Sequence, residues 1–123
     1  MNLEIRHTSP DHAVVALIGE HEGYAATRLE RALAELAATG YTLEIDLTKT
    51  AFIDSETAGV LLKAQREAEE EGREFSVVLG PDTGWPVRRL LEVTGLDAML
   101  GAEERGAQAA ASSSRSRRNS SSI

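Results

Sequence analysis

Cysteine is absent from the 123-residue sequence, and aromatic residues make up only 4% of it. The lack of cysteine excludes disulfide bonds, thiol catalysis and metal sites with cysteine ligands. No apolar run approaches the roughly 20 residues that a membrane-spanning helix needs. The segment MNLEIRHTSP also lacks the basic and apolar regions of a signal peptide. We therefore expect a cytoplasmic protein with no membrane insertion.

Hydrophobic residues make up 41% of the sequence and charged residues 27%, which is ordinary for one soluble domain. The charge is unevenly distributed. Because the formal net charge of −7 includes +3 from Arg115, Arg117 and Arg118, residues 1–105 carry −10. An acidic body disfavours nucleic acid as a partner, since affinity for phosphates depends on Lys and Arg. It favours a protein partner with a basic face, although solubility alone also accounts for it.

The first third of the chain has the pattern of a hairpin followed by a helix and a strand. Residues 3–8 alternate apolar and polar, and residues 12–19 are apolar and β-branched, so they predict two strands joined by a turn. Leucines at helical spacing predict a helix over residues 24–39, and Gly40 is a stop signal. Residues 41–47 again have the pattern of a strand.

The sequence pattern of residues 48–95 predicts two more helices and one strand. Residues 48–54 are expected to be a loop. The helix after it ends at Gly72 and has an apolar stripe formed by Val60, Leu61, Ala64 and Ala68. Residues 74–80 predict a buried strand. A third helix begins at Pro86, the residue type favoured in a first turn, and ends at Gly95.

This element order predicts an α/β domain with a mixed, mostly parallel β-sheet, an N-terminal antiparallel hairpin and helices packed against the sheet. We place the domain at residues 1–101 and a low-complexity tail at residues 102–123. From Gly106 onward the only large aliphatic residue is Ile123, so we expect disorder there.

Enzymatic motifs are missing from the sequence. It contains no Walker phosphate loop, no GxGxxG and no GxSxG. His7, His12 and His21 fall in the first strand, the following turn and a loop, without the spacing of a zinc site. The carboxylates between Glu67 and Glu71 fit a solvated helix end. We therefore predict no catalytic residues, no metal and no cofactor.

Ser55 is the candidate for function, because it stands where an apolar run ends and a helix begins. Its hydroxyl could cap that helix, a role that Asp54 could fill instead. A phosphoryl group at this position would face the positive end of the helix dipole, so the fold would tolerate the added charge. A partner fitted to the neutral serine would not tolerate it, particularly beside Asp54 and Glu56.

Several segments resemble the STAS domain family, of the anti-sigma factor antagonist type. ALIGEHEG, residues 16–23, is similar to the family's strand that ends in Gly-Glu-Leu-Asp. LEIDLTKTAFIDS, residues 43–55, is similar to its strand, loop and Asp-Ser signature, in which the serine becomes phosphorylated. PVRRLLEVTGLDAML, residues 86–100, resembles a later helix. Further matches in the helix after the signature are Gly59, Val60 and Leu62.

The resemblance covers roughly residues 3–101 and implies a STAS-like fold and a bacterial partner-switching function. The unphosphorylated domain would bind an anti-sigma factor with a histidine-kinase-like ATPase fold and thereby free a sigma factor. That kinase would phosphorylate Ser55 with its own ATP and release the domain, and a serine/threonine phosphatase would restore binding. Thr57 is the competing phosphoacceptor. The candidate partner-binding and switch residues are Glu20, Glu22, Asp46, Asp54, Glu56, Thr57 and Gly59.

Some residues depart from the family pattern. Glu56 and Thr57 replace a small hydroxyl residue and a glycine after Ser55, and His21 and Glu22 stand where Leu and Asp are usual. Glu56 places a permanent charge beside the switch. An alternative is therefore an accessory or scaffold STAS protein, either a stressosome-like subunit or the soluble component of a lipid-transport ABC system. A third is an enzyme with Ser55 as nucleophile, assisted by Asp54 or His21. The oligomeric state stays open.

Overall fold

The computed structural model describes residues 2–105. Their helices and strands, in chain order, are β1 (Asn2–Ser9), β2 (His12–His21), α1 (Tyr24–Ala38), β3 (Thr42–Asp46), β4 (Thr50–Ile53), α2 (Ser55–Glu70), β5 (Phe75–Leu79), α3 (Trp85–Thr94), α4 (Leu96–Met99) and β6 (Glu103–Glu104).

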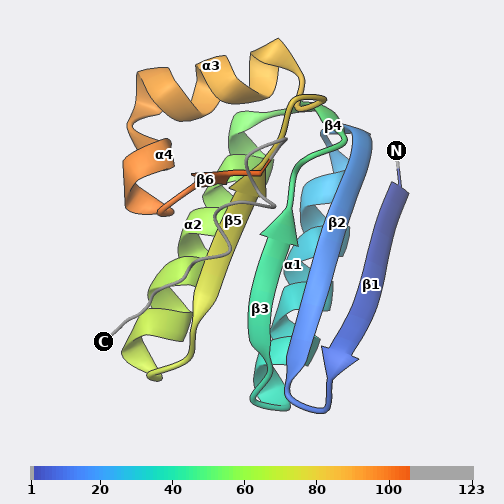
Figure 1. Ribbon diagram of the computed structural model, residues 1–123, viewed down its shortest axis with the longest axis vertical. Helices are drawn as coiled ribbons and strands as arrows, with labels where there is room; N and C mark the ends of the chain where they lie inside the picture. The colour runs from blue at the N-terminus through green and yellow to red at the C-terminus, as the bar shows by residue number, and fades with distance from the viewer. Residues whose placement is uncertain (1, 106–123) are drawn as a thin grey trace.

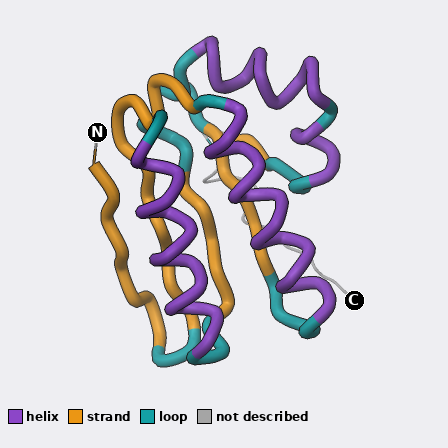
Figure 2. The backbone as a smooth tube through the Cα atoms, turned by 180° about the vertical axis from the view of Figure 1, so that it is seen from behind, coloured by secondary structure: helices purple, strands orange, loops and turns teal. Residues whose placement is uncertain are grey.

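The strands form one mixed sheet in the order β1-β2-β3-β5-β6, and β4 pairs with the far end of β2 (Figure 1). β1 and β2 are antiparallel, whereas every other described pair is parallel. This arrangement confirms the mixed sheet and the N-terminal antiparallel hairpin that the sequence predicts. α1 and α2 lie side by side against one face of the sheet (Figure 2), and α3 packs against β4 at one end.

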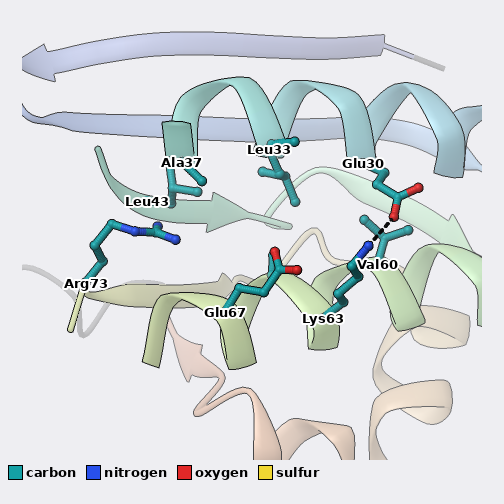
Figure 3. A pocket seen from close by; sticks show the side chains of 10 residues that line it. Glu30, Leu33, Ala37, Leu43, Val60, Lys63, Glu67 and Arg73 are labelled. Carbon is teal, nitrogen blue, oxygen red and sulfur yellow. Dashed lines mark hydrogen bonds and ion pairs between the residues drawn. The ribbon is translucent and has the colours of Figure 1, made fainter. Parts of the chain in front are cut away.

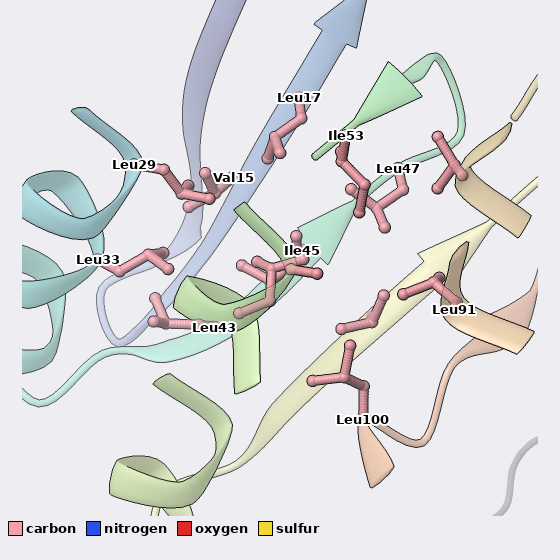
Figure 4. Close-up of a cluster of buried hydrophobic side chains, with 14 of the residues drawn as sticks. Val15, Leu17, Leu29, Leu33, Leu43, Ile45, Leu47, Ile53, Leu91 and Leu100 are labelled. Atoms are coloured by element: carbon pink, nitrogen blue, oxygen red, sulfur yellow. The ribbon is translucent and has the colours of Figure 1, made fainter. Parts of the chain in front are cut away.

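The core lies between the sheet and the two long helices (Figure 4). Alternate residues of the central strands point toward the helices because successive side chains of a strand face opposite ways. The sheet contributes Val15, Leu17 and Ile45, all fully buried, and α1 contributes Leu29 from the opposite side. Burying each of these side chains stabilises the fold by roughly 1.5–3 kcal/mol. This core fixes where the ends of the strands and the starts of the helices meet.

Three short elements differ from what the sequence predicts. The expected loop over residues 48–54 contains β4, whose Phe52 and Ile53 pair with Glu20 and His21 of β2. β4 has four residues, α4 one turn and β6 two residues, too few to show a periodic pattern. Their conformations depend on contacts with distant parts of the chain. His21 is consequently the last residue of β2 and not part of a loop, and His12 is its first.

Gly95 ends α3 as predicted. Its φ is 75° and its ψ 6°, a left-handed conformation that costs glycine little and other residues more. The turn sends the chain back so that Leu96, at the start of α4, is buried in the core cluster.

The described chain continues to pack against the sheet beyond residue 101. β6 pairs with Val78 and Leu79 of β5, and the Arg105 amide donates a hydrogen bond to the Leu79 carbonyl. The Arg88 side chain on α3 binds the Glu104 carboxylate and the Gly80 carbonyl. Residues 102–105 are thus attached to the body. The disorder predicted from Gly106 onward falls on residues outside those that the structure describes.

Candidate functional site

Ser55 lies at the first position of α2, where the N-cap is Asp54. One Asp54 carboxylate oxygen, Oδ1, accepts hydrogen bonds from the Thr57 amide at 2.8 Å and the Thr57 hydroxyl at 2.7 Å. The other, Oδ2, accepts a bond from the amide of Gly23 at 3.0 Å. The capping role that the sequence left open between Asp54 and Ser55 therefore belongs to Asp54. The Ser55 side chain is exposed and not needed for the cap.

Asp54 joins the starts of two helices. Gly23 is the N-cap of α1, so a single carboxylate holds the first turn of α2 and the residue before α1. Partial burial by itself would raise the pKa of Asp54, but hydrogen bonds donated by Thr57 and Gly23 outweigh it and lower the pKa below its usual value. Asp54 is consequently a carboxylate at neutral pH.

Thr57, the competing phosphoacceptor, is fully buried. Its hydroxyl donates to Asp54 and lies 3.3 Å from the carbonyl oxygen of His21. A kinase would have to break this contact to reach the Thr57 oxygen, whereas Ser55 presents its hydroxyl at the surface. Sequence reasoning could not separate the two residues, since they lie only two positions apart.

His21 fixes the neighbouring strands. Its Nε2 lies 3.1 Å from the Asn2 carbonyl oxygen and 3.2 Å from that of Ile18, so the ring ties β1 to β2 beside the site. Burial lowers the pKa of His21, against the opposing effect of these two backbone hydrogen bonds. The neutral His21 ring, held by two backbone carbonyls, stabilises the strands beside Ser55. It is poorly placed to act as a base for Ser55.

The structure gathers only part of the predicted partner-binding surface around Ser55. Glu56 and Gly59 are exposed on α2, and Glu20 and Glu22 are exposed at and just after the end of β2. Asp46 is different. It accepts hydrogen bonds from the Thr48 amide and hydroxyl, and with Glu4, Arg6 and Lys49 it lines a separate hollow. Asp46 therefore stabilises the turn after β3 and does not line the hollow that contains Ser55.

An open apolar groove of about 410 Å³ lies directly beside Ser55. It runs between β4, the start of α2 and α3, and its lining consists of Phe52, Ile53, Asp54, Ser55, Trp85, Pro86, Arg89, Leu90 and Val93. Trp85 is 68% exposed and Val93 61% exposed, which is high for such large apolar side chains. The Arg89 guanidinium lies over the Trp85 ring, 5.7 Å from its centroid.

Sequence reasoning missed this groove, although a signal was present. Trp85, Arg89 and Val93 recur at intervals of four and form one face of α3, distinct from the buried face formed by Val87 and Leu91. A helix with exposed apolar residues outside its core face is a candidate for binding another molecule. Tyr24, 89% exposed at the start of α1, follows the Gly23 that Asp54 holds. Exposed aromatic residues thus lie on both helices that flank the start of α2.

A third hollow, of about 130 Å³, lies between α1 and α2 (Figure 3). Its floor includes Leu33, Leu43 and Val60, and an ion pair between Lys63 and Glu30 spans it at 2.9 Å. None of the residues around Ser55 lines this hollow. Among residues 2–105 there is no cluster of His, Asp or Glu able to hold a metal ion, and no helix long and apolar enough to cross a membrane.

Comparison with known proteins points to one family. A family model described as "Mlab, STAS domain" matches residues 6–101. The anti-sigma-B factor antagonist of Listeria monocytogenes is 30% identical over 101 residues, which cover 81% of this chain and 86% of that protein.

Two solved structures share the fold. The unphosphorylated form of the anti-sigma factor antagonist SpoIIAA aligns with a TM-score of 0.74 at 18% identity, over 96% of this chain and all of the other. The phosphorylated form of SpoIIAA from Bacillus aligns with a TM-score of 0.68 at 17% identity, over 91% of this chain and 98% of the other. At these identities the similarity establishes the fold class alone, which agrees with the one that the sequence predicts.

Proposed function

The chain belongs to the STAS domain family, and from that premise we propose that it is an anti-sigma factor antagonist whose binding is switched by phosphorylation of Ser55. The observation that carries the proposal is the position of Ser55. It is an exposed hydroxyl at the first turn of a helix that Asp54 already caps, and it lies on the rim of an exposed apolar groove. The relative from Listeria, an anti-sigma-B factor antagonist, supports the same function.

The partner that fits is an anti-sigma factor with a histidine-kinase-like ATPase fold. In the unphosphorylated state, Ser55, Glu56 and Gly59 on α2, together with Trp85 across the groove, would contact it. Aromatic side chains that are exposed in the free protein and buried in the complex are typical of residues that dominate binding energy. The acidic body, with −10 over residues 1–105, favours encounter with a basic face on the partner. Such a protein works in the cytoplasm with the transcription machinery.

Phosphorylation would convert the binding surface without disturbing the fold. The Ser55 oxygen forms a bond to the γ-phosphorus of the kinase's ATP, the bond from that phosphorus to ADP breaks, and the serine proton passes to a base on the kinase. The product carries about −1.5 to −2 charges at neutral pH. These lie beside Asp54 and Glu56, so the partner would have to bury a strongly anionic patch. A serine/threonine phosphatase would hydrolyse the ester and restore binding.

The test is a binding measurement with the anti-sigma kinases of the organism's own genome, with ATP present or absent. We expect the wild-type protein to bind without ATP and to be released as Ser55 is phosphorylated, which mass spectrometry locates. Ser55→Ala should bind and stay bound. Ser9→Ala removes a hydroxyl from the end of β1 and should behave as wild type. Phosphate on Thr57 alone, or release of Ser55→Ala by ATP, contradicts the proposal.

An accessory or scaffold role is the second candidate. One observation favours it: Glu56 places a fixed carboxylate beside Ser55. This role predicts stable association with a multiprotein assembly that ATP and kinases do not alter. A Ser55-dependent enzyme has less support, since Asp54 and His21 are held by the backbone contacts described above. A serine-directed covalent probe that labelled Ser55 would favour the enzyme.

A further inference from the structure

The groove beside Ser55 carries one positive charge among its lining residues. Phe52, Ile53, Pro86, Leu90 and Val93 are apolar, and Asp54 is a carboxylate. Arg89 is the single cation of the set. Its guanidinium lies over the Trp85 ring, a contact between a cation and an aromatic face that is weak where solvent reaches it. Arg89 is exposed, so its side chain is able to change rotamer without opening the core.

A phosphate on Ser55 would have few side-chain donors nearby. The Thr57 amide of the first turn of α2 is already bonded to Asp54. The nearby charged side chains on α2 and at its cap, Glu56 and Asp54, are acidic and repel a dianion. A guanidinium presents several N–H groups in a planar fork that matches the oxygens of a phosphate, and it binds them more strongly than it binds an aromatic face.

We infer that Arg89 is the receptor for the Ser55 phosphate: on phosphorylation its guanidinium leaves the Trp85 ring and binds the phosphoryl oxygens across the groove. The modification therefore changes two features of the binding surface at once. It adds negative charge at the start of α2, and it draws Arg89 and the phosphate over the apolar wall that Trp85, Phe52 and Val93 form. A partner would be excluded by charge and by occupation of the groove. The inference rests on the proposed function only in taking Ser55 as the modified residue.

The test incorporates phosphoserine at position 55 during translation, so it requires no cognate kinase. Phosphorus NMR then follows the second ionisation of the phosphate, which has a pKa of about 6 in the absence of a partner. We expect this pKa to be higher in Arg89→Gln than in the parent by several tenths of a unit, because the guanidinium stabilises the dianion. Arg66→Gln removes an exposed arginine from α2 outside the groove and should leave the pKa as in the parent. Arg89→Lys keeps the charge without the fork and should give an intermediate value.

Trp85 supplies a second readout, since it is the only tryptophan in the chain. Its fluorescence should change between the serine and phosphoserine forms in the parent, and much less so in Arg89→Gln, where no guanidinium can leave the ring. Equal phosphate pKa values in the parent and Arg89→Gln, or equal shifts in Arg89→Gln and Arg66→Gln, would overturn the inference. Either result leaves the proposed function standing. Conversely, failure of every anti-sigma kinase to modify Ser55 would remove the proposed function and leave the phosphate measurement valid.

Discussion

The aromatic residues are largely exposed at one end of the sheet and packed against the core at the other. At the end where the parallel strands finish, Tyr24 and Trp85 are exposed and Phe52 is half-buried in the wall of the groove. At the other end, where β3 and β5 begin, Tyr41 and Phe75 pack against the core, and the Tyr41 ring lies 5.0 Å from that of His7. These are all five aromatic residues of the chain, three at one end and two at the other.

The two ends of the sheet also differ in the hydrogen bonds that cap their helices. At the Tyr41 end, α1 and α2 finish in turns that the backbone satisfies locally, such as the bonds from Gly40 to Ala37 and from Arg73 to Ala68. At the Ser55 end, one side chain, Asp54, connects two helix starts. The first end packs its aromatic side chains against the core. The second holds both helix starts through Asp54 and leaves Tyr24 and Trp85 exposed.

The largest effects are expected from replacing one aromatic residue at each end of the sheet with alanine. Trp85→Ala should weaken partner binding by at least about 2 kcal/mol, roughly 30-fold in Kd, with little change in stability, because an exposed residue loses few internal contacts. Phe75→Ala should do the reverse and cost about 2–3 kcal/mol of unfolding free energy through lost core packing. Calorimetric titration with the partner and chemical denaturation separate the two effects. Equal losses of affinity in both variants would erase the distinction between the ends.

Gly84 tests how closely α3 must approach β4 to form the groove. A Cβ at Gly84 would lie 2.1 Å from the Ala51 carbonyl oxygen, so Gly84→Ala has to move the start of α3. We expect a loss of about 1–3 kcal/mol in stability, typical of overpacking. Gly59→Ala on α2 is the control, since nothing lies within 4 Å of its added Cβ and alanine favours a helix by up to about 1 kcal/mol. Thermal unfolding of the two variants should therefore shift in opposite directions.

Asp54→Ala should lower stability by about 1 kcal/mol, within the range for loss of an N-cap. The pH dependence has a definite sign. Because the folded-state pKa of Asp54 is below its unfolded value, the stabilisation is fully present above the unfolded pKa near 4 and is lost as the pH falls through the folded-state value. The free energies of unfolding of wild type and variant, measured by denaturation, should therefore converge as the pH falls from 6 to strongly acidic values. A constant difference in unfolding free energy over that range would mean that the charge of the Asp54 carboxylate contributes nothing to stability.

His21 should make a smaller contribution to the pH dependence of stability, and in a higher pH range than Asp54. Its pKa is lowered in the folded state, so folding favours the neutral ring. The stabilisation is present above the unfolded pKa near 6.5 and declines as the pH falls below it. His21→Gln keeps a side-chain donor and should flatten the stability profile between pH 7 and 5. A profile of unchanged slope in this variant would assign the pH dependence to other groups.

The smallest effect is expected from residues 106–123, whose sequence is polar and of low complexity. Removal of residues 106–123 should change the unfolding free energy by less than about 0.5 kcal/mol, given their polar, low-complexity sequence. Removal from residue 102 onward should cost more, because it also deletes β6 and the Glu104 partner of Arg88. Melting curves of both truncated chains would place the end of the folded domain. A large loss from the shorter truncation would extend the domain beyond Arg105.

Much of the fold was predictable because its signals are local. The hairpin, the two long helices and the strands β3 and β5 each have a periodic pattern, and Gly95 ends α3 as its residue type indicates. β4, α4 and β6 were missed because each is too short for periodicity and forms through contacts with distant residues.

The site was predictable in part for the same reason. Ser55 and Asp54 stand out as polar residues between an apolar run and a helix. Other features depend on the assembled fold: the bond from Gly23 to Asp54 across 31 positions, the burial of Thr57, and the approach of α3 that brings Trp85 and Arg89 to Ser55. Asp46, which the sequence analysis lists among the candidate partner-binding residues, accepts hydrogen bonds from Thr48 and lines a different hollow from Ser55.

The double role of Asp54 also links the proposed switch at Ser55 to the assembly of the fold. Its hydrogen bond from Gly23 joins residues 31 positions apart and therefore needs β2 and β4 to lie together, whereas its bonds from Thr57 are local to the start of α2. The complete geometry around Ser55 is consequently absent from a partly assembled chain. A nascent or damaged molecule would offer a kinase a flexible peptide in place of this geometry. The Gly23 amide should then be protected from deuterium exchange only in molecules in which this part of the fold has assembled, and its protection would measure the fraction of molecules that hold the geometry around Ser55.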